Sequence, residues 1–174
     1  MTDQTLTLID DATQRLIRNA GALTDEQVAE DSLLPGWTRG HVLTHIARNA
    51  DALRNLLIWA RTGVETPAYA SQQAREDDIE AGASRTAAEL AADVSRSAEA
   101  FLIAAADLPV AARLARVSIL GAEDFPAALV LTRRLVEVEL HYTDLGCGYR
   151  RADWPAAFAT MDLPEPMRTF RSTR

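Results

Sequence analysis

The stretch RLVEVELH, residues 134–141, decides both the fold and the site that this sequence predicts. Glu137 and His141 stand four positions apart in it, and a helix places two such residues on one face, one turn from each other. A helical projection puts both side chains near the centre of the apolar face. An ionised carboxylate in a core needs a partner, so Glu137 is expected to bind one there. By the same projection, Glu139 is predicted to face solvent.

Helical patterns extend outward from this stretch over most of the chain. Apolar residues recur with a helical period over residues 3–23, which predicts a first helix. A capping box over Thr24–Gln27 opens a short helix. Thr38 is the predicted N-cap of a long helix that runs to Thr62 and is ended by Gly63.

The middle of the chain is also helical in pattern. Residues 72–106 keep a helical pattern that Gly82 interrupts, and Thr86 with Glu89 forms a second capping box. This pattern indicates either one kinked helix or two consecutive helices. A long connector follows over residues 107–125, and a connector of that length is uncommon unless it has a task such as covering a site.

The last long helix is predicted to begin at Pro126, which suits a first helical turn, and to end near Leu145. Within the connector before it, residues 116–120 fit an extended segment. The last ten residues of the chain look frayed. Four long helical units predict an all-α fold, an up-down-up-down four-helix bundle with a long connector before the last helix.

Composition limits the classes of protein and of partner. A chain of 174 residues with 48% hydrophobic residues suits one folded domain. No apolar run approaches the length of a membrane span and the N-terminus lacks a secretory signal, so we expect a cytoplasmic protein with no membrane partner. The net charge of -7, without a basic stripe, argues against nucleic acid. Cys147 is the only cysteine, which excludes an internal disulfide.

His45 is the third residue of the predicted site. It projects from the apolar face of the helix that begins at Thr38, the face that also carries Asn49. Two imidazoles and a carboxylate are the usual ligands of a zinc ion that keeps one position open for chemistry, and bundles build metal sites from facing helices. His41 is a possible fourth ligand, and Asp144 is placed to orient the ring of His141. The pattern alone leaves open that these histidines are hydrogen-bonded core residues and that Glu137 and His141 are simply a buried pair.

Two longer segments resemble the mycothiol-dependent maleylpyruvate isomerase family, within the wider group of DinB-like metal-binding bundles. They are LPGWTRGHVLTHIARNAD at residues 34–51 and RLVEVELHYTDLG at residues 134–146. The segment REDDIE at residues 75–80, together with Arg85, is similar to the third helix of the family. One departure is Val136, where the usual pattern has another arginine.

The resemblance implies a DinB-like bundle over residues 1–150 and a zinc ion held by His45, Glu137 and His141. It also implies mycothiol as the thiol cosubstrate, and we expect Asn49 and Arg75 to contact this thiol. Full-length members carry a further C-terminal lobe that supplies a substrate-binding arginine. Residues 151–174 are accordingly interpreted as a tail that is the remnant of that lobe.

The function expected from this resemblance is the mycothiol-dependent isomerisation of maleylpyruvate to fumarylpyruvate. Both ends of this substrate are anionic, so arginines are needed to bind it, and the catalytic candidates are Arg134, Arg48 and Arg85. For Arg134, a salt bridge to Glu137 or Asp144 is the alternative role. The competing functions are a mycothiol S-transferase that acts on electrophiles and a non-catalytic metal-binding module. The expected partners are small molecules, and the protein is expected to be a monomer or a homodimer.

Overall fold

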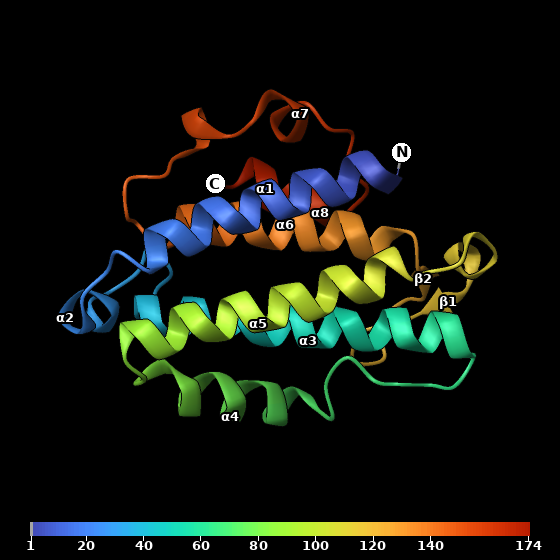
Figure 1. Cartoon of the computed structure of the whole chain (residues 1–174), viewed down its shortest axis with the longest axis horizontal. Coiled ribbons are helices and arrows are strands. Elements are labelled where there is room, and N and C mark those ends of the chain that lie inside the picture. Colours follow the sequence, from blue (N-terminus) through green and yellow to red (C-terminus); the bar gives the residue numbers. More distant parts are fainter. Residues whose placement is uncertain (1) are drawn as a thin grey trace.

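The computed structural model of the chain describes residues 2–174, which fold mainly into helices (Figure 1). In chain order the elements are α1 (Thr2–Ala20), α2 (Asp25–Ala29), α3 (Arg39–Thr62), α4 (Gln72–Ala83), α5 (Ala87–Ala106), η1 (Val110–Leu114), β1 (Arg116–Val117), β2 (Phe125–Pro126), α6 (Leu129–Asp144), η2 (Arg151–Asp153), α7 (Ala156–Ala159) and α8 (Met167–Ser172).

Four long helices form the bundle. Helix α1 packs on α5 and α6, and α3 packs on the same two helices, so each bundle helix has two neighbours. Ile9 and Leu16 of α1, Phe101 of α5 and Leu135 of α6 are completely buried between them. The predicted all-α four-helix bundle is therefore confirmed. None of the described helices is long and apolar enough to cross a membrane.

The helices do not alternate in direction as predicted. Thr44 of α3 contacts Arg85, just before α5, and Arg48 one turn later contacts Asp93 of α5, so α3 and α5 run parallel. Helix α4 lies outside the bundle and carries the chain back between them (Figure 1). Because this extra pass replaces a short loop, the order becomes up-down-down-up instead of up-down-up-down.

The predicted caps explain the helix boundaries around the site. At the start of α3, the Thr38 hydroxyl accepts a hydrogen bond from the backbone N–H of His41. At its end, Gly63 adopts the left-handed region with φ of 72°. The pattern over residues 72–106 resolves into two helices, with Thr86 and Glu89 capping the second. A side chain at Gly82 would collide with Thr44, so this glycine lets α4 approach α3 closely.

The connector forms a small antiparallel pair, in which Val117 of β1 faces Phe125 of β2. Pro126 lies in β2 and not in the last helix, which begins at Leu129. The backbone N–H groups of Ala127 and Ala128 donate to carbonyls of the connector, and this pairing delays the start of the helix. The connector lines no part of the cavity described below, so covering that site is not its task.

The end of the chain is folded, which corrects the prediction of a frayed segment. Helix α8 packs on α6, with Met167 2% exposed. The Arg171 guanidinium donates to the carbonyl of Phe158, and Arg174 forms an ion pair with Asp144 of α6. These long-range contacts place α8 beside the C-terminal half of α6 and bring the last residues next to the site.

Candidate metal centre

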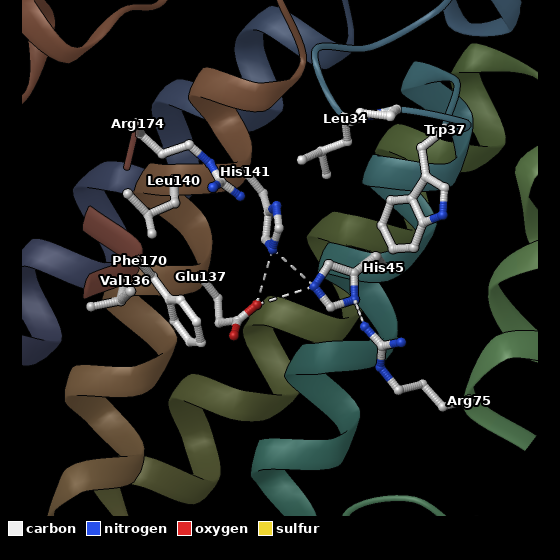
Figure 2. A pocket seen from close by; sticks show the side chains of 11 residues that line it. Leu34, Trp37, His45, Arg75, Val136, Glu137, Leu140, His141, Phe170 and Arg174 are labelled. Carbon is white, nitrogen blue, oxygen red and sulfur yellow. Dashed lines mark hydrogen bonds and ion pairs between the residues drawn. The ribbon is translucent and has the colours of Figure 1, made fainter. Parts of the chain in front are cut away.

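His45, Glu137 and His141 converge between α3 and α6 (Figure 2). The Nε2 atom of His45 lies 3.1 Å from Oε2 of Glu137 and 3.1 Å from Nε2 of His141. The distance between His141 Nε2 and Glu137 Oε2 is 3.3 Å. The three side chains thus point one nitrogen or oxygen each at a common centre, as their helical spacing predicts.

Arg134, one turn before Glu137, links α3 and α6 beside this centre. Its Nη1 donates to the carbonyl of Ile46 at 2.8 Å and to Oδ1 of Asn49 at 3.0 Å, and the side chain is completely buried. Ile46 directly follows His45 in the chain. Arg134 therefore fixes the separation of α3 and α6 at the level where their ligand atoms meet.

The triangle of ligand atoms has the size that a tetrahedral metal ion requires. Zinc bonds of roughly 2.0–2.1 Å to nitrogen and oxygen, at tetrahedral angles, separate neighbouring ligand atoms by about 3.3 Å. The three observed separations lie between 3.1 and 3.3 Å. Two imidazoles and one carboxylate at these separations therefore fit such an ion.

The outer nitrogens of the two histidines have different partners. His141 Nδ1 lies 2.9 Å from Oδ2 of Asp144, which holds the ring with its Nε2 toward the centre, as predicted for Asp144. Nη2 of Arg75 lies 3.3 Å from Nδ1 of His45. A guanidinium only donates, so Nδ1 of His45 accepts here and its Nε2 carries the hydrogen. A metal ion at His45 Nε2 requires the other tautomer, with Arg75 turned away.

The protonation equilibria follow from the same contacts. Burial and the neighbouring His141 lower the pKa of His45 to about 4. Burial opposes a charge on His141, but hydrogen bonds to Asp144 and Glu137 outweigh it and raise the pKa of His141 to about 9. Burial likewise opposes the charge of Glu137, yet both histidines hold the pKa of this carboxyl well below its ordinary value. Without a metal ion, the centre therefore holds a neutral His45 between an ionised Glu137 and a charged His141.

A cavity of about 400 Å³ opens onto His45, Glu137 and His141 (Figure 2). Arg75 from α4 and Arg174 from the end of the chain add positive charge to its wall. The Arg174 charge is offset by Asp144, whose Oδ1 lies 2.7 Å from Arg174 Nε. Arg75 contacts His45 and the ring of Tyr69, and neither of these is an acid. The rest of the wall is apolar and consists of Leu34, Pro35, Trp37, Val136, Leu140 and Phe170.

The three arginines predicted to bind substrate do not line this cavity. Arg134 is buried behind Glu137. Arg48 and Arg85 both donate to the carboxylate of Asp93, which is 7% exposed, and they join α3 to the start of α5. Their pairing with Asp93 could not be foreseen, because α3 and α5 were not known to run parallel. The arginines that do line the cavity are Arg75, for which contact with the thiol was predicted, and Arg174.

Two further polar candidates lie outside the cavity. Asn49 accepts a hydrogen bond from Arg134 and is 6% exposed. His41 does not join the three ligands: its Nδ1 accepts from the backbone N–H of Thr38, and its Nε2 lies 3.1 Å from Glu80. Its place in the first helical turn, where it closes the capping box, turns the ring toward α4.

The burial of Glu139 differs from the predicted orientation of the last helix. It was expected in solvent, but it is 1% exposed and accepts hydrogen bonds from Arg15 of α1 at 2.7 Å and from the Tyr149 hydroxyl at 2.6 Å. Burial raises its pKa despite these partners. Helix α6 is covered on two sides, by α3 and by α1, so Glu139 is buried although it does not share the face of Glu137. The contributions of Phe170 and Arg174 were also missed, because no local pattern near the end of the chain signals contact with α6.

Comparison with known proteins agrees with this geometry. The family model described as the mycothiol maleylpyruvate isomerase N-terminal domain matches residues 9–146. A crystal structure of the mycothiol-dependent maleylpyruvate isomerase is 33% identical, with a TM-score of 0.86 over 91% of this chain and 66% of that chain. A histidine-to-alanine mutant of that enzyme is 32% identical, with a TM-score of 0.85 and the same coverage. No curated protein sequence matches the chain.

This chain thus spans 66% of the length of the solved chains that it resembles. The matched segment contains His45, Glu137 and His141 together with Arg75 and Asp144. By sequence match and by structural likeness, the chain belongs to the mycothiol maleylpyruvate isomerase N-terminal domain family.

Proposed function

We propose that this chain is a zinc-dependent enzyme that uses mycothiol to convert maleylpyruvate into fumarylpyruvate. The observation that carries the proposal is the convergence of two imidazole nitrogens and one carboxylate oxygen on one point at the wall of a cavity. Membership of the isomerase family supports the choice of thiol and substrate. The solved relatives extend beyond the part that this chain covers.

Zinc is the metal we propose because its preferences match the ligands. A set of two histidines and one glutamate is typical of zinc sites that keep a position for chemistry, whereas iron–sulfur and soft-thiolate sites need several cysteines. Asp144 fixes the ring of His141, as the outer partners of metal-bound histidines do. When bound, zinc would supply a positive charge that lowers the pKa of a thiol and favours its thiolate at neutral pH.

The proposed reaction needs no external base once the thiolate is formed. The sulfur forms a bond to one carbon of the cis double bond, and the π electrons move through the conjugated system onto the carbonyl oxygen. The former double bond is then single and rotates. The electron pair returns from the oxygen, the carbon–sulfur bond breaks, and the trans product and the thiolate are released. Atoms and electrons balance without an oxidant or reductant.

The cavity wall supports this chemistry in two ways. The apolar side chains around the ligands keep water from the reacting carbon and strengthen the attraction between charges there. We assign Arg75 to a carboxylate of the substrate, because its guanidinium reaches His45 and forms no ion pair with an acid among the described residues. The tautomer change that His45 needs for metal binding frees Arg75 for this contact.

The end of the chain is included in the proposed site. Phe170 and Arg174 line the cavity, and Arg174 shares the carboxylate of Asp144 with His141. We propose that residues 1–150 form the metal-binding bundle and that residues 151–174 complete one wall of its cavity. Deleting residues 167–174 should then reduce the isomerisation rate while the bundle stays folded.

The deciding experiment is an assay of the purified, zinc-loaded protein. Maleylpyruvate should be converted into fumarylpyruvate only when mycothiol is present, and Glu137→Gln should abolish this conversion. Consumption of mycothiol by an electrophile such as monochlorobimane, without isomerisation, would instead identify a thiol transferase. No reaction of either kind would contradict the proposal and favour a metal-binding module.

A further inference from the structure

A second hollow lies on the other side of Arg75. It has a volume of about 490 Å³ and is bounded by α3, by the loop before α4 and by the first turns of α4. Arg75 is the one side chain that lines both this groove and the cavity at the ligands. Its guanidinium carbon lies 5.8 Å from the ring centroid of Tyr69 in the groove, while its Nη2 faces His45. One side chain therefore separates the two spaces.

The groove differs from the cavity in chemical character. Part of its lining consists of small residues, which leave room for a ligand: Ala52, Ala68, Ala70 and Ala74. Its rim carries carboxylate, amide, hydroxyl and guanidinium groups, each able to bond more than one ligand atom. These polar residues are Arg48, Asp51, Asn55, Thr66, Tyr69 and Asp78.

The charges in the groove favour a neutral ligand. Asp51 and Asp78 balance Arg48 and Arg75, and Arg48 is already engaged by Asp93 and by Asp51. An anion would meet two carboxylates, and a cation would meet two guanidinium groups. A ligand rich in hydroxyl groups both donates and accepts, so it can bond the acids and the bases together.

We propose that this groove binds the polyhydroxyl portion of the thiol cosubstrate, while the thiol passes Arg75 and reaches the three ligands. This inference rests on the proposed function, and it gives the proposed mycothiol site a second binding region. Mycothiol joins a cysteine to a glucosamine–inositol unit, so it has a reactive end for the cavity and a neutral, hydroxyl-rich end for the groove. Arg75 separates the cavity from the groove, and this separation matches the two ends of mycothiol, the thiol end and the hydroxyl-rich end.

The test measures binding of the thiol-free part alone. N-acetylglucosaminyl-inositol, which cannot react, is titrated calorimetrically into the whole protein and into four variants. Ala74→Phe fills the groove, and Asp78→Ala removes a carboxylate that has no partner among the described residues. Asp77→Ala, on the neighbouring position of α4, and Ala92→Phe, on the exposed face of α5, are the matched controls.

We expect saturable binding that Ala74→Phe abolishes and Asp78→Ala weakens by roughly tenfold, the loss of one hydrogen bond to a charged group. The two controls should change the affinity by less than about twofold. Absence of binding to the unaltered protein, or equal effects of Asp78→Ala and Asp77→Ala, would overturn the proposal. Because the probe carries no thiol, its binding does not depend on isomerisation. A groove that does not bind the probe and a protein that does not isomerise maleylpyruvate are therefore separate outcomes.

Discussion

The Nε2 atoms of His45 and His141 lie 3.1 Å apart, although 96 positions separate the two residues in the chain. In the metal-free state both of these nitrogens carry a hydrogen, so they repel each other unless an anion accepts from them. Glu137 faces both nitrogens and carries the negative charge that either one requires. The stability of the metal-free centre should therefore depend on pH.

The metal-free protein should lose stability as the pH rises toward 9. The pKa of His141 is raised in the fold to about 9 from its ordinary value of 6.5, so its protonation stabilises the folded state. This contribution, on the order of 3 kcal/mol, is fully present below about pH 6.5 and is lost as the pH rises through 9. Urea unfolding at pH 6 and pH 9.5 after chelation measures it. The difference should shrink in His141→Gln, and an unchanged difference would contradict the assignment.

Glu139→Ala should destabilise the protein without removing its metal ion. The substitution takes the acceptor away from Arg15 and Tyr149 in a closed environment, so we expect a loss of about 2–3 kcal/mol in the free energy of unfolding. Arg15 remains partly exposed, which limits the loss. Metal content, measured on the folded protein, should stay at the level of the unaltered chain. Loss of metal in this variant would show that the ligand face of α6 is misassigned.

Substitution of Arg75 should affect substrate binding, whereas substitution of Arg85 should affect stability. We expect Arg75→Gln to raise KM for the anionic substrate by roughly 10- to 100-fold, since a charge-assisted hydrogen bond is lost, with little change in the midpoint of urea unfolding. Arg85→Gln should leave KM unchanged and lower the free energy of unfolding by about 1–2 kcal/mol, because it frees one side of Asp93. The reverse pattern would return the substrate-binding role to Arg85.

Arg134 should behave as a positioning residue. Arg134→Ala leaves a cavity and removes the donor to Ile46 and Asn49, which should cost about 3–5 kcal/mol. Arg134→Met should cost at least 1 kcal/mol less, because it refills the space and removes two buried N–H groups, Nε and Nη2, that have no acceptor among the described residues. Unfolding in urea compares the two variants. Equal losses would mean that the charge itself, and not the packing, stabilises the helix pair.

The sequence was sufficient for features that depend on short spacings. Glu137 and His141 are four positions apart on one helix, and Thr38 and Gly63 cap their own helix, so local geometry determines all four. His45 could be placed because it shares a face with apolar residues of a long helix. These residues were enough to predict the bundle and the convergence of His45, Glu137 and His141.

Features that depend on distant parts of the chain could not be predicted in this way. Glu139 is buried by Arg15, 124 positions away, and the face that it occupies has no local signal. The parallel order of α3 and α5 follows from the outward position of α4, which periodicity does not reveal. The same holds for Arg174, which reaches Asp144 only because α8 packs on α6.

The most direct test of the account is the metal content of the purified chain and of two matched variants. The unaltered protein should bind about one zinc ion per chain, Glu137→Gln should bind almost none, and Glu139→Gln, with the same change two positions away, should bind as much as the unaltered protein. An unaltered protein that takes up no zinc even when reloaded, or equal zinc in both variants, would contradict the claim that His45, Glu137 and His141 hold one metal ion.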